Sequence, residues 1–295
     1  MTTNETPYKS ITINEPLPAC SVDYRVLNRL LDILIDVNKE AVNIDFSAFK
    51  KLENESDDDF SKRKGSLKAL YQVSVTILGS KGEFIFFDSP ISLDEAKLPT
   101  VINKVIFDTG VKYNFQLKCF PPNRAKLEFD FSKARIFDLQ SLPSEPTPNS
   151  SCIEVIGTNE TWVCGVHKKI LGLIEEHLTK GGLLHKSNVY DLLIWFLFIP
   201  ITFTLIYRLE NWFHTSQKLP VILTVACYFY TFLLSLNIFR ILFNYSRWVL
   251  PKVELIGQHQ SNSALHRGII VAIFSALSLS LLYDIVRMGL SLPIK

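Results

Sequence analysis

The chain has 295 residues, of which 47% are apolar, and 31 Lys and Arg against 29 Asp and Glu give a formal net charge of +2. This near balance provides no basic field of the kind that attracts nucleic acid, so we expect no nucleic-acid partner. The five cysteines contain no CxxC pair, which favours free thiols in a reducing compartment over a disulfide framework. The length allows two units.

The N-terminal part is expected to be a soluble domain preceded by a short lead. Residues 1–20 are polar and lack the basic flank and apolar run of a signal peptide, so we expect a flexible lead there and a cytosolic domain over 21–186. A helix should begin near Ser21 or Asp23. Apolar residues then recur at helical spacing, at Val26, Leu27, Leu30, Leu31, Leu34 and Val37.

Alternating apolar and polar residues predict strands through the middle of this domain. The predicted strands cover 69–79, 83–88, 101–108, 112–120, 125–131 and 152–156. Tight turns join several of them and one face of each is polar, which indicates an antiparallel sheet covered on one side by helices. The charged segment from Lys50 to Lys68 lacks the ligand order of a calcium loop and is expected to be a solvated loop or helix end.

A second helix should follow the last strand, with Thr158 or Asn159 as its N-cap and Gly181-Gly182 after its end. Its expected buried stripe consists of Trp162, Val163, Val166, Ile170, Leu173 and Ile174. Helix, strands and helix in this order predict an α+β fold, an antiparallel β-sheet domain with flanking helices.

The remaining residues, 187–295, are expected to form a three-helix transmembrane region. The expected spans are at about 189–208, 219–240 and 268–287, since a bilayer core needs about 20 mostly apolar residues per helix. A two-span alternative places the first segment at the interface, although that segment shows no polar stripe. Lys and Arg are more frequent on the domain side, four against two in each comparison, which predicts a multi-pass inner-membrane (plasma-membrane) protein with its domain cytoplasmic and its C-terminus outside.

Two sets of residues in this region are candidate site residues. Small residues at steps of four along the third span predict a close helix-packing face, within one protomer or in a homo-oligomer: Gly268, Ala272, Ala276 and Ser280. Charges mark the expected membrane boundaries, with Asp191 and Arg240 inside and Asp284 and Arg287 outside. Because they lie near interfaces, topology anchors are favoured over a transport pathway.

No enzyme constellation is evident. The six histidines show no HExxH or metal-ligand spacing, and GxSxG, phosphate-loop and dinucleotide motifs are missing. We therefore expect no catalytic residue, no cofactor and no metal. His259 and His266 beside Arg267 are compatible with lipid head groups, but a plain juxtamembrane loop is the favoured interpretation.

The layout of a cytosolic α+β domain followed by a few spans resembles, in outline, membrane effectors of bacterial anti-phage systems. In those proteins a cytosolic domain detects a ligand or partner, and the spans cluster and breach the inner membrane. The resemblance implies a non-enzymatic sensor or effector with an abortive-infection role. The alternatives are a membrane-anchored scaffold or accessory subunit that recruits a cytosolic partner, and an enzyme at the membrane surface that depends on Asp191, His259 or Arg240.

The segment Val189–Tyr207 is expected to couple the domain to the membrane. Only the short stretch Gly181–Asn188 separates it from the preceding helix, which is short for a flexible linker.

Overall fold

The computed structural model describes residues 10–47, 49–94, 98–138, 143–216, 220–257 and 260–291, without the side chains of 211–216, 260–264, 281, 284, 285 and 287–291. Two compact units alternate along the chain. The α+β unit comprises Met1–Ser132, Asn149–Lys180 and Val253–Gln258, and the helical unit comprises Lys133–Pro148, Gly181–Lys252 and His259–Lys295. Six alternating segments make five passages of the chain between units, whereas the sequence predicted one boundary near residue 186.

The α+β unit is built on a six-stranded sheet in the order β1-β7-β6-β5-β3-β4, with every neighbouring pair antiparallel. Its strands are β1 (Ile11–Pro16), β3 (Ser74–Gly79), β4 (Phe84–Phe87), β5 (Ile102–Asp108), β6 (Arg124–Asp130) and β7 (Cys152–Gly157). The predicted α+β class and antiparallel sheet are confirmed.

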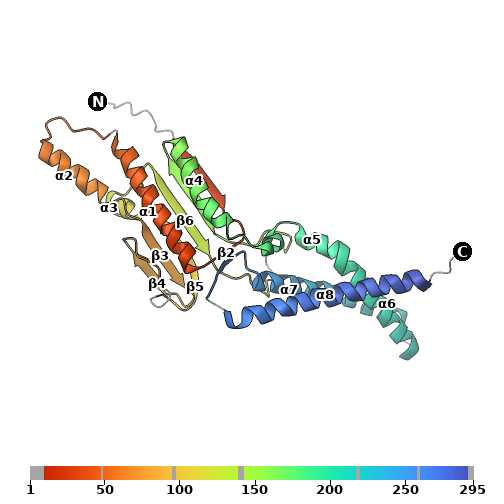
Figure 1. Ribbon diagram of the computed structural model, residues 1–295. Helices are drawn as coiled ribbons and strands as arrows, with labels where there is room; N and C mark the ends of the chain where they lie inside the picture. Colours follow the sequence, from red (N-terminus) through yellow and green to blue (C-terminus); the bar gives the residue numbers. More distant parts are fainter. Residues whose placement is uncertain are drawn as a thin grey trace. The chain divides into compact units, whose positions relative to one another are not determined.

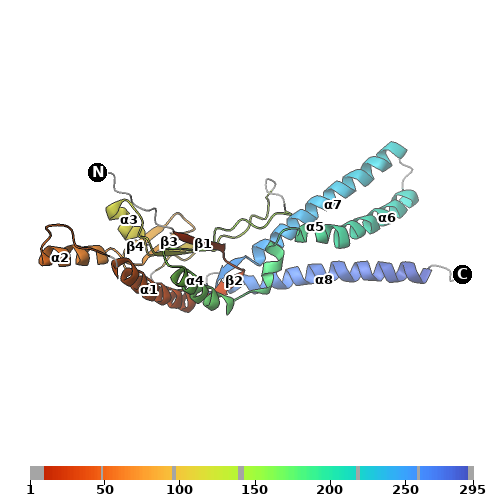
Figure 2. The same ribbon diagram turned by 90° about the horizontal axis from the view of Figure 1, so that it is seen from above.

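Two helices, α1 (Tyr24–Ser47) and α4 (Glu160–Glu175), lie on one face of the sheet (Figure 1, Figure 2). Each begins where a side chain caps it: Asp23 Oδ1 accepts from Val26 N at 2.8 Å, and Asn159 Oδ1 accepts from Trp162 N at 3.2 Å. The apolar stripes predicted for both helices are buried against the sheet, and Phe107 and Phe129 fill the centre of this core.

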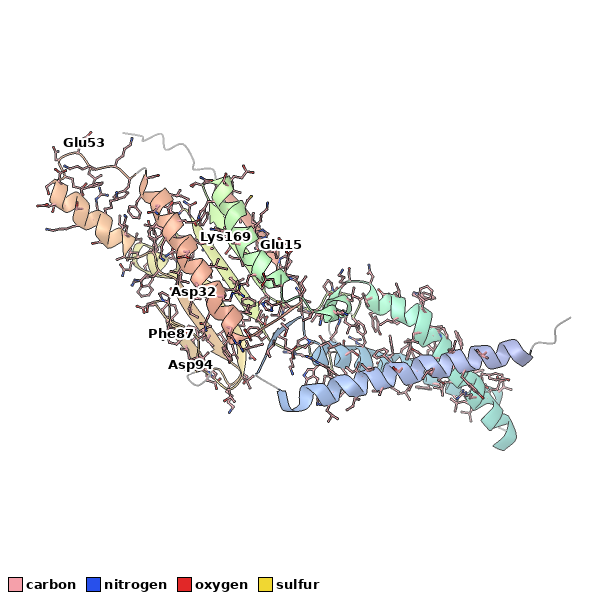
Figure 3. The ribbon with its side chains drawn as sticks, viewed as in Figure 1. Glu15, Asp32, Glu53, Phe87, Asp94 and Lys169 are labelled. Carbon is pink, nitrogen blue, oxygen red and sulfur yellow. The ribbon has the colours of Figure 1, made fainter. Side chains whose placement is uncertain are left out.

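The outer faces of these helices are polar, as their periodicity predicts. Figure 3 locates Asp32 on α1 and Lys169 on α4, and Lys169 Nζ lies 3.0 Å from Glu40 Oε1 between the two helices. This exposed pair contributes little to stability, so the buried stripes hold the helices in place.

The expectation of a flexible lead over 1–20 is wrong for its described part. Residues Ile11–Pro16 form β1, an edge strand paired with β7, and Cys20–Val22 form β2, which pairs in parallel with β8 (Val253–Leu255). An edge strand has one side without a partner, so it tolerates polar residues and a terminal proline that mask its pattern.

A second correction concerns 112–120, which is a helix, α3 (Val111–Leu117), and not a strand. Its neighbours β5 and β6 pair directly, with Asp108 opposite Lys126, so the residues between them have no sheet position to occupy. The helix ends at Lys118 in the left-handed conformation, with φ of 57°. Phe115 is 77% exposed, which shows that the alternation here does not reflect burial.

The charged segment before β3 contains a further helix, α2 (Asp57–Lys68). Ser56 caps it by accepting from Asp59 N at 3.1 Å, and the acidic first turn suits the positive end of a helix dipole. Arg63 donates to both carboxylate oxygens of Glu55 at 2.7 Å, which lowers the pKa of Glu55 to about 2. The segment that was expected to be a solvated loop or a helix end therefore contains a complete helix.

In the helical unit, two segments are long and apolar enough to cross a membrane, Val189–Glu210 with a mean hydropathy of 2.1 and Val221–Val249 with 1.9. Little of either segment is buried inside the chain. The first comprises α5 (Val189–Leu193), a π-helical turn (Ile194–Phe198) and most of α6 (Ile199–Ser216); the second is α7 (Val221–Val249). The third expected span lies in α8 (Gln260–Ser291), whose described apolar part, Leu265–Ser280, is shorter.

Aromatic rings join the first two apolar segments. The Phe239 ring centroid lies 4.2 Å from that of Phe198 and 5.6 Å from that of Tyr190, and Phe243 lies 5.1 Å from Tyr190. The π-helical turn precedes Pro200, which has no N–H to donate and so disturbs the regular helix before it. The turn brings Phe198 into this aromatic cluster, where it is buried.

Candidate functional site

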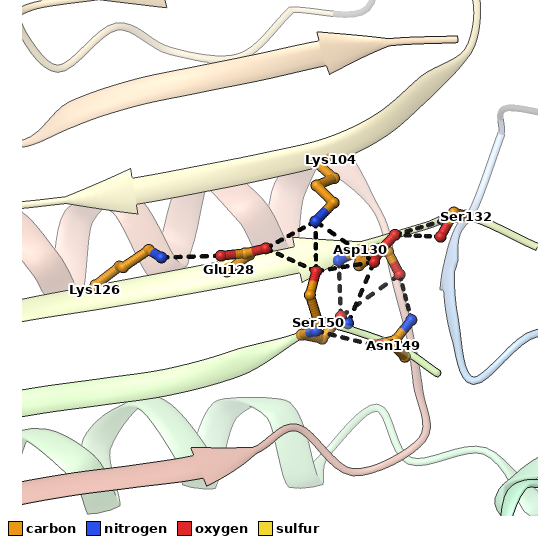
Figure 4. Close-up of polar contacts among 8 residues, drawn as sticks. Lys104, Lys126, Glu128, Asp130, Ser132, Asn149 and Ser150 are labelled. Carbon is orange, nitrogen blue, oxygen red and sulfur yellow. Dashed lines mark hydrogen bonds and ion pairs between the residues drawn. The ribbon is translucent and has the colours of Figure 1, made fainter. Parts of the chain in front are cut away.

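A polar network lies on the sheet face opposite α1 and α4 (Figure 4). Lys104 on β5 donates to Ser150 Oγ at 2.6 Å and to Glu128 Oε1 at 3.1 Å, and its ammonium lies 3.7 Å from Asp130 Oδ2. Glu128 and Asp130 face this side because they alternate along β6 with the inward-facing Leu127 and Phe129. The network joins charged side chains from strands β5 and β6 to the neutral polar residues Asn149 and Ser150, which precede β7.

A serine beside a lysine is one arrangement that activates a nucleophile. Here Lys104 donates its own hydrogen to Ser150 and forms ion pairs with two carboxylates, so as an ammonium it has no lone pair to accept the serine proton. The contacts of Lys104 with Ser150, Glu128 and Asp130 therefore have a structural role and do not form a catalytic pair. We call this set of contacts the clamp.

The clamp fastens both ends of the segment 133–148, which belongs to the helical unit. Asp130 Oδ1 accepts from Ser132 N at 3.0 Å, and Asn149 Nδ2 donates to the Asp130 carbonyl at 2.8 Å. Burial raises the pKa of Asp130, but the hydrogen bonds from Ser132 and Ser150 outweigh it and lower that pKa overall. The carboxylate is thus held in its charged form where the chain leaves and re-enters the sheet.

A second polar cluster fastens the C-terminal part of α1 to the loops beside it. Asp45 Oδ2 accepts from the Tyr71 hydroxyl at 2.8 Å, Asn123 Nδ2 also donates to Asp45, and Asn123 Oδ1 accepts from Thr158 N at 2.9 Å. Burial raises the pKa of Asp45, and these donors oppose it. These hydrogen bonds connect α1 to the loops that contain Tyr71, Asn123 and Thr158, so the cluster has a structural role.

Within the helical unit, segment 133–148 contacts α5 at Asp191 and the C-terminal part of α7 at Asn244 and Arg247. Arg247 on α7 donates to the Glu145 carbonyl at 3.0 Å, and Asn244 donates to the Ile136 carbonyl at 3.4 Å. Ser144 Oγ donates to Asp191 Oδ1 at 2.6 Å. We call this set of contacts the basal junction.

His185 occupies the centre of the basal junction and is buried. Its Nε2 donates to the Leu250 carbonyl at 2.6 Å, so in the neutral ring Nδ1 accepts from Thr147 Oγ1 at 2.8 Å. Burial lowers the pKa of His185, and the nearby charges of Arg247 and Lys252 lower it further, whereas the Leu250 carbonyl raises it. The ring thus favours its neutral form.

A cavity of about 340 Å³ that is partly open to the surface lies at the basal junction. It is lined by Lys133, Ala134, Arg135, Asp138, Thr147, Pro148, Asn244 and Arg247. Three cationic side chains against a single carboxylate make it electropositive. We take the cavity and the basal junction as the candidate functional site, because they combine a ligand-sized space with convergent polar groups.

The residues predicted as a packing face lie along one side of α8, and all four are exposed within the chain: Gly268, Ala272, Ala276 and Ser280. A Cβ atom added at Gly268 would meet nothing within 4 Å. α8 instead buries Ile270. In the described part of the chain, this face is therefore not used for packing within one protomer.

The predicted boundary charges have separate surroundings. Asp191 joins the basal junction through Ser144, and Arg240 lies half-buried on α7, where it makes an interaction of its own. The side chains of Asp284 and Arg287 lie outside the described residues, as does the whole of His259.

Sequence reasoning missed the lining of the cavity. Segment 133–148 is rich in proline and serine and reads as a connecting loop, and no pattern relates it to α7, about 100 residues later. One signal was present. Asn244 and Arg247 lie one turn apart just beyond the predicted second span, where polar side chains next to a bilayer need partners.

Among the described residues, no group of three or more His, Cys, Asp or Glu side chains is arranged to hold a metal ion. The described cysteines are free thiols, and Cys20 is buried. Comparison with known proteins finds no matching family model, no matching curated protein and no matching solved structure.

Proposed function

We propose that this protein is a non-enzymatic membrane sensor or effector, whose α+β unit binds a ligand or partner and transmits that binding to membrane-spanning helices. The observation that supports this most is the position of β8. This strand lies between α7 and α8 in the sequence, yet it pairs with β2 in the α+β unit, with Cys20 opposite Val253 and Val22 opposite Leu255.

The β8 pairing supports a topology. Val253 follows the end of α7 after three residues, so the C-terminal end of α7 belongs on the same side of a bilayer as the α+β unit. The first apolar segment also starts on that side, because it follows α4 closely. The connection between α6 and α7 then lies on the opposite side, in agreement with the Lys and Arg bias.

The proposal includes α8 as a third span that begins on the domain side and places the C-terminus outside. Its 32 residues make a helix of roughly 48 Å, longer than the roughly 30 Å of the hydrocarbon core. The exposed Gly268–Ser280 face supports assembly of several protomers through this helix, because small residues allow close helix approach in lipid. Clustering of this kind underlies the proposed abortive-infection role at the inner membrane.

Repeated passage of the chain between units favours transmission over simple tethering. A scaffold needs one linker, whereas here segment 133–148, the connection at Lys180 and strand β8 each join the two units covalently. Lengthening Gly181–Asn188 alone should therefore weaken transmission without abolishing it.

The experiment for this proposal measures membrane potential in cells that express the full chain with its genomic neighbours under phage challenge. We expect depolarisation by the wild type and none by Ala276→Leu, which fills the small-residue face of α8, with Ile269→Leu as a control elsewhere on that helix. Depolarisation that never occurs under any trigger would exclude the effector role.

A scaffold that recruits a cytosolic partner is the second candidate, and the open edge of the sheet favours it. β4 is the last strand in the sheet order, and its Phe84 and Phe86 are exposed. Exposed aromatic side chains on an edge strand are suited to a partner that adds a strand. Stable capture of one partner by full-length protein, lost in Phe86→Lys, without any depolarisation, would favour this role over the first.

A further inference from the structure

We propose that the cavity of the basal junction binds the phosphate group of an anionic lipid. This inference rests on the membrane-anchoring part of the proposed function, and not on the sensor or effector role. It follows from the charge of the cavity, from the way its most buried cation is held, and from the aromatic residues around it.

The charge of the cavity selects an anion. Lys133, Arg135 and Arg247 line it together with one acid, Asp138. Arg presents planar paired donors that match phosphate oxygens, and Lys adds a mobile charge. The volume of about 340 Å³ is at the small end of ligand pockets, which suits a head group better than a large cofactor.

Arg247 is fixed before any ligand arrives. Only 5% of the residue is exposed, its Nε donates to the Leu184 carbonyl at 2.9 Å, and its Nη2 donates to the Glu145 carbonyl at 3.0 Å. Its guanidinium also lies 4.6 Å from the centroid of the Phe243 ring. These partners are neutral, so they orient the guanidinium without cancelling its charge, and a guanidinium has further N–H donors to offer.

Among the described Lys and Arg residues, Arg247 is the buried one, and its partners are neutral. Lys104 on the sheet has two carboxylates for its charge, whereas no described carboxylate lies within ion-pair distance of Arg247. A buried cation without a counter-charge is costly, and a bound phosphate oxygen would offset that cost.

The surroundings of the cavity identify the source of the phosphate. Trp248 and Tyr245 occupy the domain-side end of α7, with ring centroids 5.9 Å apart, and the Tyr245 hydroxyl lies 2.6 Å from His266 Nδ1 on α8. Lys133 Nζ lies 4.7 Å from the centroid of the Trp248 ring. Tyr and Trp gather at the depth of lipid head groups, and basic pockets between helices on the cytoplasmic side bind such groups.

Native mass spectrometry of the full-length protein in detergent, with added phosphatidylglycerol or phosphatidylcholine, tests this assignment. The wild type should retain phosphatidylglycerol in preference to phosphatidylcholine. Each cation near a head group contributes roughly a fivefold gain in affinity, so Lys133→Gln with Arg135→Gln should weaken phosphatidylglycerol binding about thirtyfold. Arg247 is left unchanged because it also holds the basal junction together.

The matched control is Lys186→Gln, which removes an exposed cation of the same unit that does not line the cavity. It should bind phosphatidylglycerol as the wild type does. Equal binding by all three proteins would overturn the cavity assignment. Displacement of the lipid by millimolar inorganic phosphate would also overturn the lipid assignment, and would identify the cavity as a site for soluble phosphates.

Alkaline extraction of membranes separates this inference from the proposed function. If Lys133→Gln with Arg135→Gln remains in the membrane pellet but loses no lipid affinity, the cavity assignment fails and the anchoring stands. If the wild type is released into the soluble fraction, anchoring itself fails.

Discussion

The two units use apolar side chains in opposite ways. In the α+β unit, the inward-facing apolar side chains of the sheet and the apolar stripes of α1 and α4 are buried in one core. In the helical unit, a small aromatic cluster around Phe239 is buried, while Trp195, Phe196, Ile222 and Leu234 are exposed within the chain. Such a surface is untenable in water and natural in lipid. This difference supports the proposal that the helical unit lies in lipid and the α+β unit in water.

This contrast predicts its largest effect in the core of the α+β unit. Phe129→Ala removes a fully buried ring that stacks on Phe131 at 5.9 Å, so the free energy of unfolding of this unit should fall by about 3–5 kcal/mol. Hydrogen exchange of the β5, β6 and β7 amides in the full-length protein measures it. Phe229→Ala on α7, where the ring is exposed, should leave this exchange unchanged; an equal effect of both would contradict the placement of the two units in lipid and in water.

The next effect concerns the exposed apolar side chains of the two units. Leu234 lies near the middle of α7 and is 62% exposed, so Leu234→Arg should cost about 3 kcal/mol of membrane insertion. The membrane-integrated fraction after alkaline extraction measures this loss. In the α+β unit, Phe115 is 77% exposed, and Phe115→Arg should change nothing measurable because water surrounds this side chain. If Leu234→Arg is also silent, α7 does not cross a membrane.

A smaller effect separates the two N-cap candidates of α4. Asn159→Ala should destabilise the α+β unit by about 1 kcal/mol, because Asn159 accepts the Trp162 N–H. Thr158→Ala should cost less, since its hydroxyl makes only a 3.5 Å contact with Asn123. Thermal unfolding of both variants decides the matter, and the reverse order would show that Thr158 is the cap.

The smallest effect is a pH dependence confined to the helical unit. The folded state lowers the pKa of His185 below its ordinary value of 6.5, so its contribution is present above pH 6.5 and is lost as the pH falls below it. The protection factors of the Ser144, Glu145 and Thr147 amides, which are exchange rates corrected for the intrinsic pH dependence, should therefore fall between pH 7.5 and 5. His185→Gln should remove that fall, and an unchanged pH response in this variant would assign it to another group.

The sequence predicted the α+β unit best where burial and periodicity coincide. The stripes of α1 and α4 and the inward residues of β3, β5, β6 and β7 are buried as expected, because each contributes to one core. It failed at the edge strand β1, where only Ile11 and Ile13 pack against the core, and at α3, whose Phe115 is exposed. The local sequence pattern alone does not specify whether an apolar side chain is buried against another helix or strand.

The candidate site was less accessible to prediction than the fold. Asp191 was singled out as a boundary charge, and its contact with Ser144 places it in the basal junction. The cavity lining comes from segment 133–148 and from α7. The periodicity of each segment gives no sign that the two segments contact each other. The return of β8 to the α+β unit was missed for the same reason: three residues are too few to show an alternation.

Membrane topology is the central claim, and substituted-cysteine labelling of intact cells tests it most directly. In a background with the five native cysteines replaced by serine, Ser216→Cys lies at the end of α6 and Ser187→Cys lies just before α5. A membrane-impermeant maleimide should label Ser216→Cys in intact cells and Ser187→Cys only after permeabilisation. Equal labelling of both positions in intact cells would contradict the crossing of the membrane by the first apolar segment.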